Sequence, residues 1–237
     1  MGDLDRVLSA LEPEANKLVV VDGVFSMIGD IAPLRDISAL CGKHSARLMV
    51  DDAHSVGVLG GGRGTPIHLG VNDQVDLVMG TFSKSFASLG GFIAGAESVL
   101  HYVKHNARSL IFSASMPPGN VAAVSAALDI MIEEPERIDR VNEIGAYMRG
   151  EFQRLGFNTG DSQTPIIPII IGDESATLLV WRLLFEEGVY TNPVPPPAVP
   201  PNLSLLRTSY MATHTNDQMA FVLDKFAKIG KMTGLIP

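Results

Sequence analysis

The stretch that decides the fold is VDLVMGTFSKS, residues 75–85. The run VDLVMGTF within it is apolar and suits a buried strand, and Gly90 and Gly91 follow closely. Lys84 is therefore predicted just beyond the end of a central strand. In open α/β sheets, ligands bind at the carboxyl ends of the strands. We interpret Lys84 as a lysine kept for covalent chemistry.

A second apolar run, RLMVDDAH at residues 47–54, ends in Asp51 and His54 in the same manner. Two strand ends thus offer an amine, a carboxylate and an imidazole. Successive residues of a strand point to opposite faces, so Asp52 is expected to point away from Asp51 and is left out of the site.

Strand-like and helix-like segments alternate in the first half of the chain. Residues 17–24, 48–50 and 75–81 are typical of strands, and residues 34–44 are typical of a helix. This alternation predicts an α/β fold with a parallel sheet covered by helices on both faces. Helical patterns then follow at residues 117–132 and, after an interruption at Pro135, onward to Leu155.

The second half predicts a smaller α+β domain. It contains a strand at residues 165–171, a helix at 174–187, and extended pieces at 189–190 and 203–207. The sequence TNDQ at 215–218 is a capping box that begins the last helix. Residues 192–201 are too rich in proline for a helix or central strand and are expected to form an extended loop. We predict a large domain at 1–134 and a small domain at 135–237.

Composition limits the function classes. The 237 residues are 46% hydrophobic and carry a net charge of −8, which argues against broad nucleic-acid binding. The single cysteine excludes an internal disulfide framework, and the six histidines lack metal-ligand spacing, so no metal site is expected. No apolar stretch has the length of a membrane span and no secretory signal is recognised, which favours a cytoplasmic setting.

The strand-end residues suit one cofactor chemistry. An aldehyde cofactor such as pyridoxal 5'-phosphate needs an amine to hold it, an acid beside its pyridine nitrogen and donors for its phosphate. Lys84 supplies the amine and Asp51 the acid, and His54 could bond the ring's phenolic oxygen. Thr81 and Ser83 could contact the ring or its phosphate. Composition and spacing alone leave this as one possibility among several.

Five motifs make a family resemblance specific. In chain order they are DGVFSMIGDIAPL (22–34), VDDAHSVG (50–57), GTFSKS (80–85), IFSASMPP (111–118) and LRTS (206–209). Together they resemble the α-oxoamine synthases, a pyridoxal-phosphate family that includes serine palmitoyltransferase, 8-amino-7-oxononanoate synthase, 2-amino-3-ketobutyrate CoA ligase and 5-aminolevulinate synthase. The resemblance covers nearly the whole chain. It implies the pyridoxal-phosphate transferase fold of type I.

The resemblance implies roles for residues that hold the cofactor ring. Lys84 matches the Schiff-base lysine, and Asp51 matches the acid at the pyridine nitrogen. His54 and Ser26 match groups near the phenolic oxygen.

Four further residues match phosphate and substrate contacts of the family. Thr81 and Ser83 fall where the family contacts the phosphate or orients the lysine. Ser113 matches a hydroxyl that reaches the phosphate of the neighbouring subunit, which implies a homodimer. Arg207 matches the arginine that grips the carboxylate of the amino-acid substrate, a task that suits its planar fork.

The implied reaction is condensation of a small amino acid with an acyl-CoA, with loss of carbon dioxide. Serine with a long acyl chain is favoured, as in sphingolipid synthesis, ahead of alanine with a pimeloyl thioester, as in biotin synthesis. Two alternatives stay open. One is an aminotransferase of class I or II, which yields an oxo acid without CoA. The other is a non-catalytic, truncated partner subunit.

The chain departs from the family pattern in two places. Family members carry an upstream segment with a glycine-containing turn for the phosphate and an aromatic ring stacked on the cofactor, and neither is recognised before Lys17. We therefore expect a large domain that lacks its N-terminal part. In one branch of serine palmitoyltransferases an arginine precedes the Pro-Pro-Ala-Thr-Pro loop, and Pro195 occupies that place here.

Overall fold

The computed structural model describes residues 1–237, which divide into two compact units. The first unit comprises residues 1–24 and 32–138, and the second comprises residues 25–31 and 139–237. The segment 25–31 thus groups with the second unit although it follows the first strand directly. The predicted boundary between the large and the small domain, at residues 134 and 135, stays a prediction.

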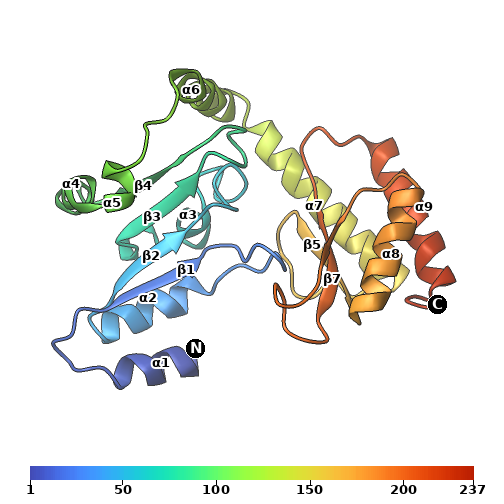
Figure 1. Cartoon of the computed structure of the whole chain (residues 1–237), viewed down its shortest axis with the longest axis horizontal. Coiled ribbons are helices and arrows are strands. Elements are labelled where there is room, and N and C mark those ends of the chain that lie inside the picture. Colours follow the sequence, from blue (N-terminus) through green and yellow to red (C-terminus); the bar gives the residue numbers. More distant parts are fainter. The chain divides into compact units, whose positions relative to one another are not determined.

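The first unit holds a four-stranded sheet and most of the helices (Figure 1). Its strands are β1 (Leu18–Asp22), β2 (Arg47–Asp51), β3 (Leu77–Thr81) and β4 (Gly91–Gly95). Its helices are α1 (Gly2–Ser9), α2 (Leu34–Lys43), α3 (Thr65–Leu69), the 3₁₀ turn η1 (Asn72–Gln74), α4 (Glu97–Asn106), α5 (Arg108–Ile111) and α6 (Pro118–Glu133). The strands and the helix predicted at residues 17–81 are confirmed.

The strands follow the order β1-β2-β3-β4, and the first three are parallel. β4 pairs antiparallel with β3, so the sheet is mostly parallel, as the predicted fold class implies. The length of the connection explains the direction of β4. Only residues 82–90 separate the two strands, whereas a parallel crossover needs a dozen or more residues.

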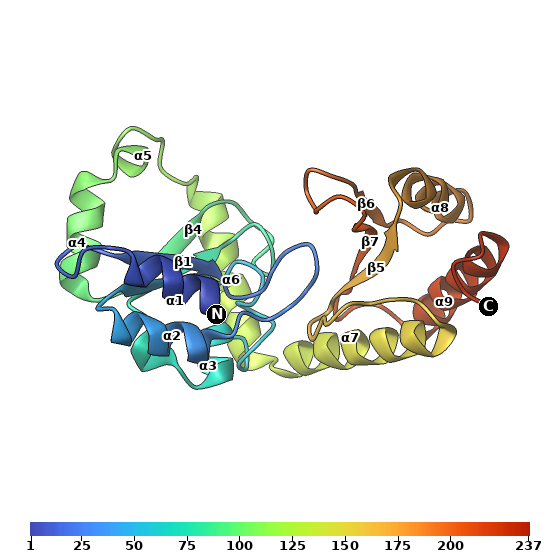
Figure 2. The same cartoon turned by 90° about the horizontal axis from the view of Figure 1, so that it is seen from below.

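One face of the sheet carries the core of the first unit. α2 and α3 lie on the same side of the strands (Figure 2). Buried side chains from α2 pack there on those of β2, namely Leu34, Ile37, Cys41, Leu48 and Val50.

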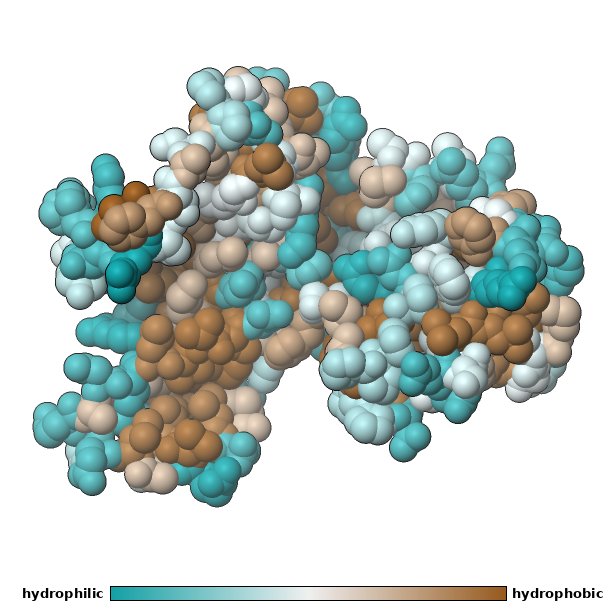
Figure 3. Space-filling view, in the orientation of Figure 1, coloured by the Kyte–Doolittle hydropathy of each residue, from teal (hydrophilic) through white to brown (hydrophobic).

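α2 and α3 do not cover the opposite face of the sheet. The prediction that helices cover both faces is therefore wrong for that face. Leu18 and Val20 of β1 are 56% and 58% exposed, and Figure 3 shows a broad hydrophobic area over the part of the first unit formed by β1 and β2. Among all helices of the chain, none combines the length and apolar character that crossing a bilayer requires.

Gly23 lies in close contact with Asp52 and Thr65, so a substitution there tests this packing. Its amide donates to the Asp51 carbonyl at 2.8 Å. A Cβ placed on Gly23 would lie 2.2 Å from Oδ1 of Asp52 and 2.6 Å from Oγ1 of Thr65. Gly23→Ala is therefore expected to destabilise the first unit by about 1–3 kcal/mol, as overpacking of cores does. The thiol of Cys41, the only cysteine and buried in this unit, should then react about 10 to 100 times faster with a thiol reagent.

Gly42 provides the control for this substitution. It lies in α2, and a Cβ there would meet nothing within 4 Å. Gly42→Ala is expected to stabilise the helix by about 0.5–1 kcal/mol, because glycine is costly inside helices. Equal labelling rates of Cys41 in both variants would contradict the close contact at Gly23.

The second unit holds a three-stranded antiparallel sheet with helices packed on it. The strands follow the order β5-β7-β6, with β5 at Ile166–Gly172, β6 at Asn192–Val194 and β7 at Ser204–Ser209. The helices are α7 (Glu136–Leu155), whose first residues belong to the first unit, α8 (Glu174–Glu186) and α9 (Asn216–Met232). The predicted helices and the strands near residues 166 and 204 are confirmed.

One prediction for this sheet is wrong. The strand β6 lies in the proline-rich segment that was expected to form an extended loop, whereas the extended piece at residues 189–190 belongs to no strand. β6 is an edge strand paired only with β7. An edge tolerates Pro193 because one side of an edge strand needs no ladder hydrogen bond.

The core of the second unit is built on three phenylalanine rings. Phe152 from α7 lies 4.9 Å from Phe226 of α9 and 5.9 Å from Phe157, between ring centroids. Apolar side chains of β5 and β7 pack against them. The predicted capping box at α9 is present, with Thr215 and Gln218 each bonding the other's backbone amide.

Candidate active site

The carboxyl ends of the parallel strands bring together most of the predicted site residues of the first unit. Asp51 is the last residue of β2, and Lys84 follows the last residue of β3, Thr81, by three positions. Asp22 ends β1 and is the register partner of Asp51. Register partners in neighbouring strands point to the same face, so the two carboxylates share one side of the sheet.

Asp51 and Asp52 have separate surroundings, as expected from their alternation. Oδ1 of Asp51 accepts a hydrogen bond from the Ala53 amide at 3.0 Å, and the residue is half-buried. Asp52 is fully buried on the other side and accepts from the Thr65 amide at 2.8 Å. Burial raises the pKa of Asp52. Asp52 thus fastens the loop between residues 52 and 65, whereas Asp51 remains at the strand-end site.

The lysine loop is held by local hydrogen bonds and aromatic contacts. The Lys84 carbonyl accepts from the Ala87 amide at 2.9 Å, and Ser88 donates its amide to Phe82 at 2.8 Å. Phe82 and Phe86 pack edge to face with centroids 5.2 Å apart. The loop backbone is therefore ordered while the Lys84 residue itself is exposed.

The lysine loop is also joined to the turn that carries His54. Oγ of Ser85 donates to the Val56 carbonyl at 2.8 Å. His54 lies in the turn directly after β2, two residues before Val56, and is half-buried. The bond fixes these two segments of the predicted site relative to each other.

Two hydroxyl groups lie next to each other beside the lysine. Oγ1 of Thr81 and Oγ of Ser83 are 2.8 Å apart, and the Ser83 amide donates to Oγ1 of Thr81 at 3.3 Å. Ser83 is exposed and Thr81 is half-buried. Both hydroxyls can rotate to donate to an anion at this edge of the sheet.

The electrostatics of the strand ends identify Asp22 as a group that the sequence reasoning did not assign. Burial raises the pKa of Asp22, and the Asp51 carboxylate raises it further, whereas the Lys84 amine lowers it. Asp22 is therefore coupled to both predicted catalytic groups. The signal that could have found it was the same as for Asp51, an acid that ends an apolar strand.

This coupling predicts a pH dependence. Because the folded pKa of Asp22 lies above its ordinary value of 3.8, the folded first unit binds more protons than the unfolded chain in the window just above pH 4. Stability due to this group therefore falls as pH rises through that window. Asp22→Asn is expected to be more stable than the parent at pH 7, with the difference narrowing toward pH 4.

Urea titrations with pulse labelling of Cys41 measure the effect of Asp22→Asn. Asp73→Asn, at an exposed carboxylate of the same unit, is the control. The coupling would be contradicted if the urea midpoint of Cys41 labelling were the same in Asp22→Asn as in the parent at both pH 7 and pH 4.

Ser113 lies apart from the strand ends in the sequence, just after α5. Its residue is exposed, and its hydroxyl donates to the Ser109 carbonyl. Its predicted contact with a neighbouring subunit stays a prediction.

The two remaining predicted residues, Ser26 and Arg207, lie in the second unit. Nε of Arg207 in β7 donates to the Ser26 carbonyl at 2.7 Å, although 181 positions separate them. Burial lowers the pKa of Arg207, and none of the chain's ion pairs includes it. A partly buried guanidinium without a counter-ion is a costly arrangement. Arg207 thus makes no ion pair with a protein carboxylate.

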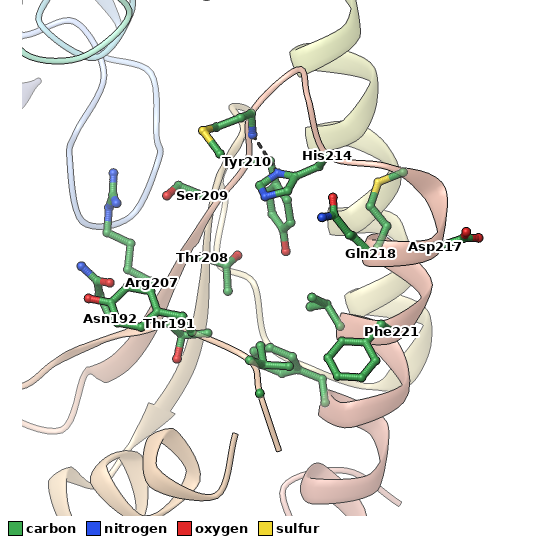
Figure 4. A pocket seen from close by; sticks show the side chains of 17 residues that line it. Thr191, Asn192, Arg207, Thr208, Ser209, Tyr210, His214, Asp217, Gln218 and Phe221 are labelled. Atoms are coloured by element: carbon green, nitrogen blue, oxygen red, sulfur yellow. Dashed lines mark hydrogen bonds between the residues drawn. The ribbon is translucent and has the colours of Figure 1, made fainter. Parts of the chain in front are cut away.

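Arg207 lies at the margin of a cavity of about 640 Å³ in the second unit (Figure 4). The cavity is lined by the end of β7, the segment 188–192 and one face of α9. The Met211 amide donates to Nδ1 of His214 at 3.0 Å there, and the Tyr210 hydroxyl is buried without a partner. No sequence pattern signals this cavity, because its walls come from separate segments that only the fold brings together.

Comparison with known proteins agrees with the motifs. The chain matches the family described as “Aminotransferase class I and II” over residues 1–226. The chain belongs to this family. Relatives with similar sequences include a serine palmitoyltransferase of Sphingobacterium spiritivorum, 49% identical over 98% of this chain and 58% of that protein. An 8-amino-7-oxononanoate synthase of Symbiobacterium thermophilum is 44% identical over 100% of this chain and 61% of that protein.

A solved family member has the same fold. A chain described as SPT with PLP has a TM-score of 0.95 and 37% identity, with 99% of this chain and 60% of that chain covered. The relatives carry two names from the α-oxoamine synthases, so the resemblance to that group and the type I fold are confirmed. The chain spans about 60% of the length of the curated relatives it matches.

Proposed function

We propose that this chain carries the cofactor- and substrate-binding residues of a pyridoxal-phosphate-dependent acyltransferase. The reaction joins a small amino acid, with serine favoured, to an acyl-CoA and releases CoA and carbon dioxide. The observation that carries the proposal is the set of groups at the ends of β1, β2 and β3. There Lys84 lies in an ordered loop, and its charge interacts with Asp22, the register partner of Asp51.

The donor set at these strand ends fits pyridoxal phosphate. Lys84 offers the amine that binds the cofactor's aldehyde covalently, and Asp51 offers a carboxylate for the pyridine nitrogen. Oγ1 of Thr81 and Oγ of Ser83 are placed to donate to phosphate oxygens, and His54 is suited to the phenolic oxygen. When bound, this cofactor supplies an electron sink for a carbanion at the substrate's α-carbon.

Three side chains then have separate roles in the reaction. The negative charge of Asp51 would favour a proton on the pyridine nitrogen of the bound cofactor. Nζ of Lys84 removes the α-proton of the amino acid. Arg207, which has no protein counter-ion, binds the substrate carboxylate with its planar fork.

Further roles follow from the resemblance. Ser26 would bond the phenolic oxygen of the cofactor, and Ser113 would reach the phosphate held by a neighbouring copy. The active form is therefore a homodimer, in keeping with the common two-fold symmetry of soluble oligomers.

Product analysis tests the proposal. Protein loaded with pyridoxal phosphate is incubated with labelled serine and palmitoyl-CoA, and carbon dioxide, free CoA and the aminoketone are quantified. Equal amounts of all three are expected. An oxo acid formed without CoA release would establish aminotransferase chemistry instead, which the family's description makes the competing candidate.

The role of Arg207 leads to a prediction on binding. Arg207→Lys keeps the charge but loses the bidentate geometry, so KM for the amino acid is expected to rise about 10- to 100-fold with little change in kcat. Steady-state kinetics of the active assembly measure both constants. Arg182→Lys, at an exposed arginine of α8, should change neither. A fall in kcat at unchanged KM would argue against carboxylate binding by Arg207.

A further inference from the structure

Residues 25–31, which we call the 25–31 turn, belong to the second unit although they follow β1 closely. The turn is closed by its own backbone. The Gly29 amide donates to the Phe25 carbonyl at 2.8 Å, and the Phe25 amide donates to the Asp30 carbonyl at 2.9 Å. Because these bonds join its two ends, a displacement at one residue of the turn is passed on to the others.

Side chains of the second unit hold the turn in place. Oγ1 of the buried Thr164 donates to the Gly29 carbonyl at 3.0 Å, and the Gln163 amide adds a longer bond of 3.4 Å to the same carbonyl. Ile28 packs on a small buried apolar cluster that consists of Val194, Val199 and Leu205. The turn is thus fixed by a polar and an apolar contact.

Gly29 lies so close to β5 that its position allows no side chain. A Cβ on Gly29 would lie 2.2 Å from the Ile166 carbonyl oxygen, and its φ of +76° favours glycine as well. Any larger residue there would have to move the turn away from β5.

The turn presents one backbone acceptor to Arg207. Nε of Arg207 donates to the Ser26 carbonyl at 2.7 Å. Figure 4 shows the Arg207 side chain on the opposite side of β7 from Thr208 and Tyr210. A guanidinium can bind a carboxylate through Nε and one Nη or through both Nη groups. Because the Ser26 carbonyl occupies Nε, the two Nη groups are the pair that remains for a bidentate carboxylate.

This bond also orders the arginine before a substrate arrives. A free arginine side chain samples many rotamers, and fixing it during binding costs affinity. A guanidinium that is already bonded to a backbone carbonyl has fewer rotamers to lose. The benefit depends on how firmly the 25–31 turn holds that carbonyl.

We propose that Thr164 and Gly29 are positioning residues for the amino-acid substrate. They hold the Ser26 carbonyl, which presets Arg207 so that its two Nη groups bind the substrate carboxylate. This inference rests on the proposed function, in which Arg207 binds that carboxylate. Thr164 and Gly29 act through Arg207 and need no contact with the substrate.

The ordering of Arg207 is measured without turnover. Heteronuclear NMR of the chain follows solvent exchange of the Arg207 Nε–H, the signal that Arg207→Lys removes. Thr164→Val keeps the branched shape but loses the hydroxyl bond to Gly29, so exchange is expected to be at least about tenfold faster. Thr177→Val is the control, since it removes another buried hydroxyl of this unit, which donates to the Asp173 carbonyl at 2.7 Å. It should leave the exchange rate unchanged.

Gly29→Ala displaces the turn by a different route. It keeps the Thr164 hydroxyl but brings a Cβ against the Ile166 carbonyl, so the Arg207 Nε–H should again exchange faster. Gly234→Ala is its control, because Gly234 has a φ of +71° but a Cβ there would meet nothing within 4 Å. Trp181 fluorescence verifies that the second unit is folded in each variant.

Kinetics of the active assembly separate positioning from a purely structural role. Ethanolamine is serine without its carboxylate, so its inhibition constant does not depend on carboxylate binding by Arg207. Thr164→Val and Gly29→Ala are expected to raise KM for serine about 3- to 10-fold, with kcat and the inhibition constant of ethanolamine little changed. General damage to the site would weaken both compounds.

Three outcomes would overturn the proposal. The first is parental exchange of the Arg207 Nε–H in both variants. The second is faster exchange with an unchanged KM for serine, and the third is an equal loss of affinity for serine and ethanolamine. Nε–H exchange needs no enzymatic activity. A chain that orders Arg207 through the turn but fails the product analysis would therefore overturn the proposed function and not the role of Thr164 and Gly29 in holding Arg207.

Discussion

Lys84→Ala is expected to abolish covalent capture of pyridoxal phosphate by this chain. In the parent, borohydride reduction followed by peptide mapping should place the cofactor on the peptide that contains Lys84. The reason is positional: Lys84 lies in an ordered loop just beyond the carboxyl end of β3, where open sheets bind ligands. Its amine is also coupled to Asp22. Turnover by the active assembly should fall by about 10³-fold or more, since one group both binds the cofactor and moves the proton.

Lys104→Ala is the matched control for this prediction. Lys104 is an exposed lysine of α4 in the same unit. Its replacement should leave the labelled peptide and the amount of trapped cofactor unchanged. Trapped cofactor that stays at the parental level in Lys84→Ala, or that maps to another lysine, would remove the basis of the proposed function.

Phe152→Ala is expected to cost the second unit about 3–5 kcal/mol of unfolding free energy. The ring is fully buried and packs between Phe157 and Phe226, so its loss leaves a cavity enclosed by rigid neighbours. Trp181 is the only tryptophan and packs on the same core, with its Nε1 donating to the Thr191 carbonyl at 3.1 Å. Urea titration followed by its fluorescence therefore reports on the second unit alone.

Phe185→Ala serves as the control for the core substitution. Phe185 is 57% exposed on α8, so its truncation creates little cavity and should cost less than about 1 kcal/mol. Cys41 labelling should be the same in both variants, because that thiol lies in the core of the first unit. A shift of the fluorescence midpoint as large for Phe185→Ala as for Phe152→Ala would contradict the assigned core.

The order of strands and helices in the first half was readable from local patterns. The apolar runs that end at Asp51 and shortly before Lys84 are strands, which is why both residues could be placed in advance at the carboxyl edge of the sheet. The capping box at Thr215 was readable for a similar reason, because both of its partners lie within four residues.

Features were missed or wrongly predicted where the outcome depended on how segments meet. The antiparallel direction of β4 follows from a connection too short for a crossover, which hydrophobic periodicity does not register. The strand β6 forms in a proline-rich segment because β7 offers it an edge. Asp22 could have been assigned from the same strand-end pattern as Asp51, but its interaction with Asp51 and Lys84 depends on the strand register.

The amino-acid sequence by itself determined the periodic elements, the residues at the strand ends and the family, because these depend on residue types at short, regular spacings. Only the tertiary structure decided that Asp22 lies in register with Asp51, that Arg207 reaches the Ser26 carbonyl, and that one face of the first sheet is open. These three features depend on which distant segments become neighbours. That is set by sheet register and packing across the whole fold, which no local pattern encodes.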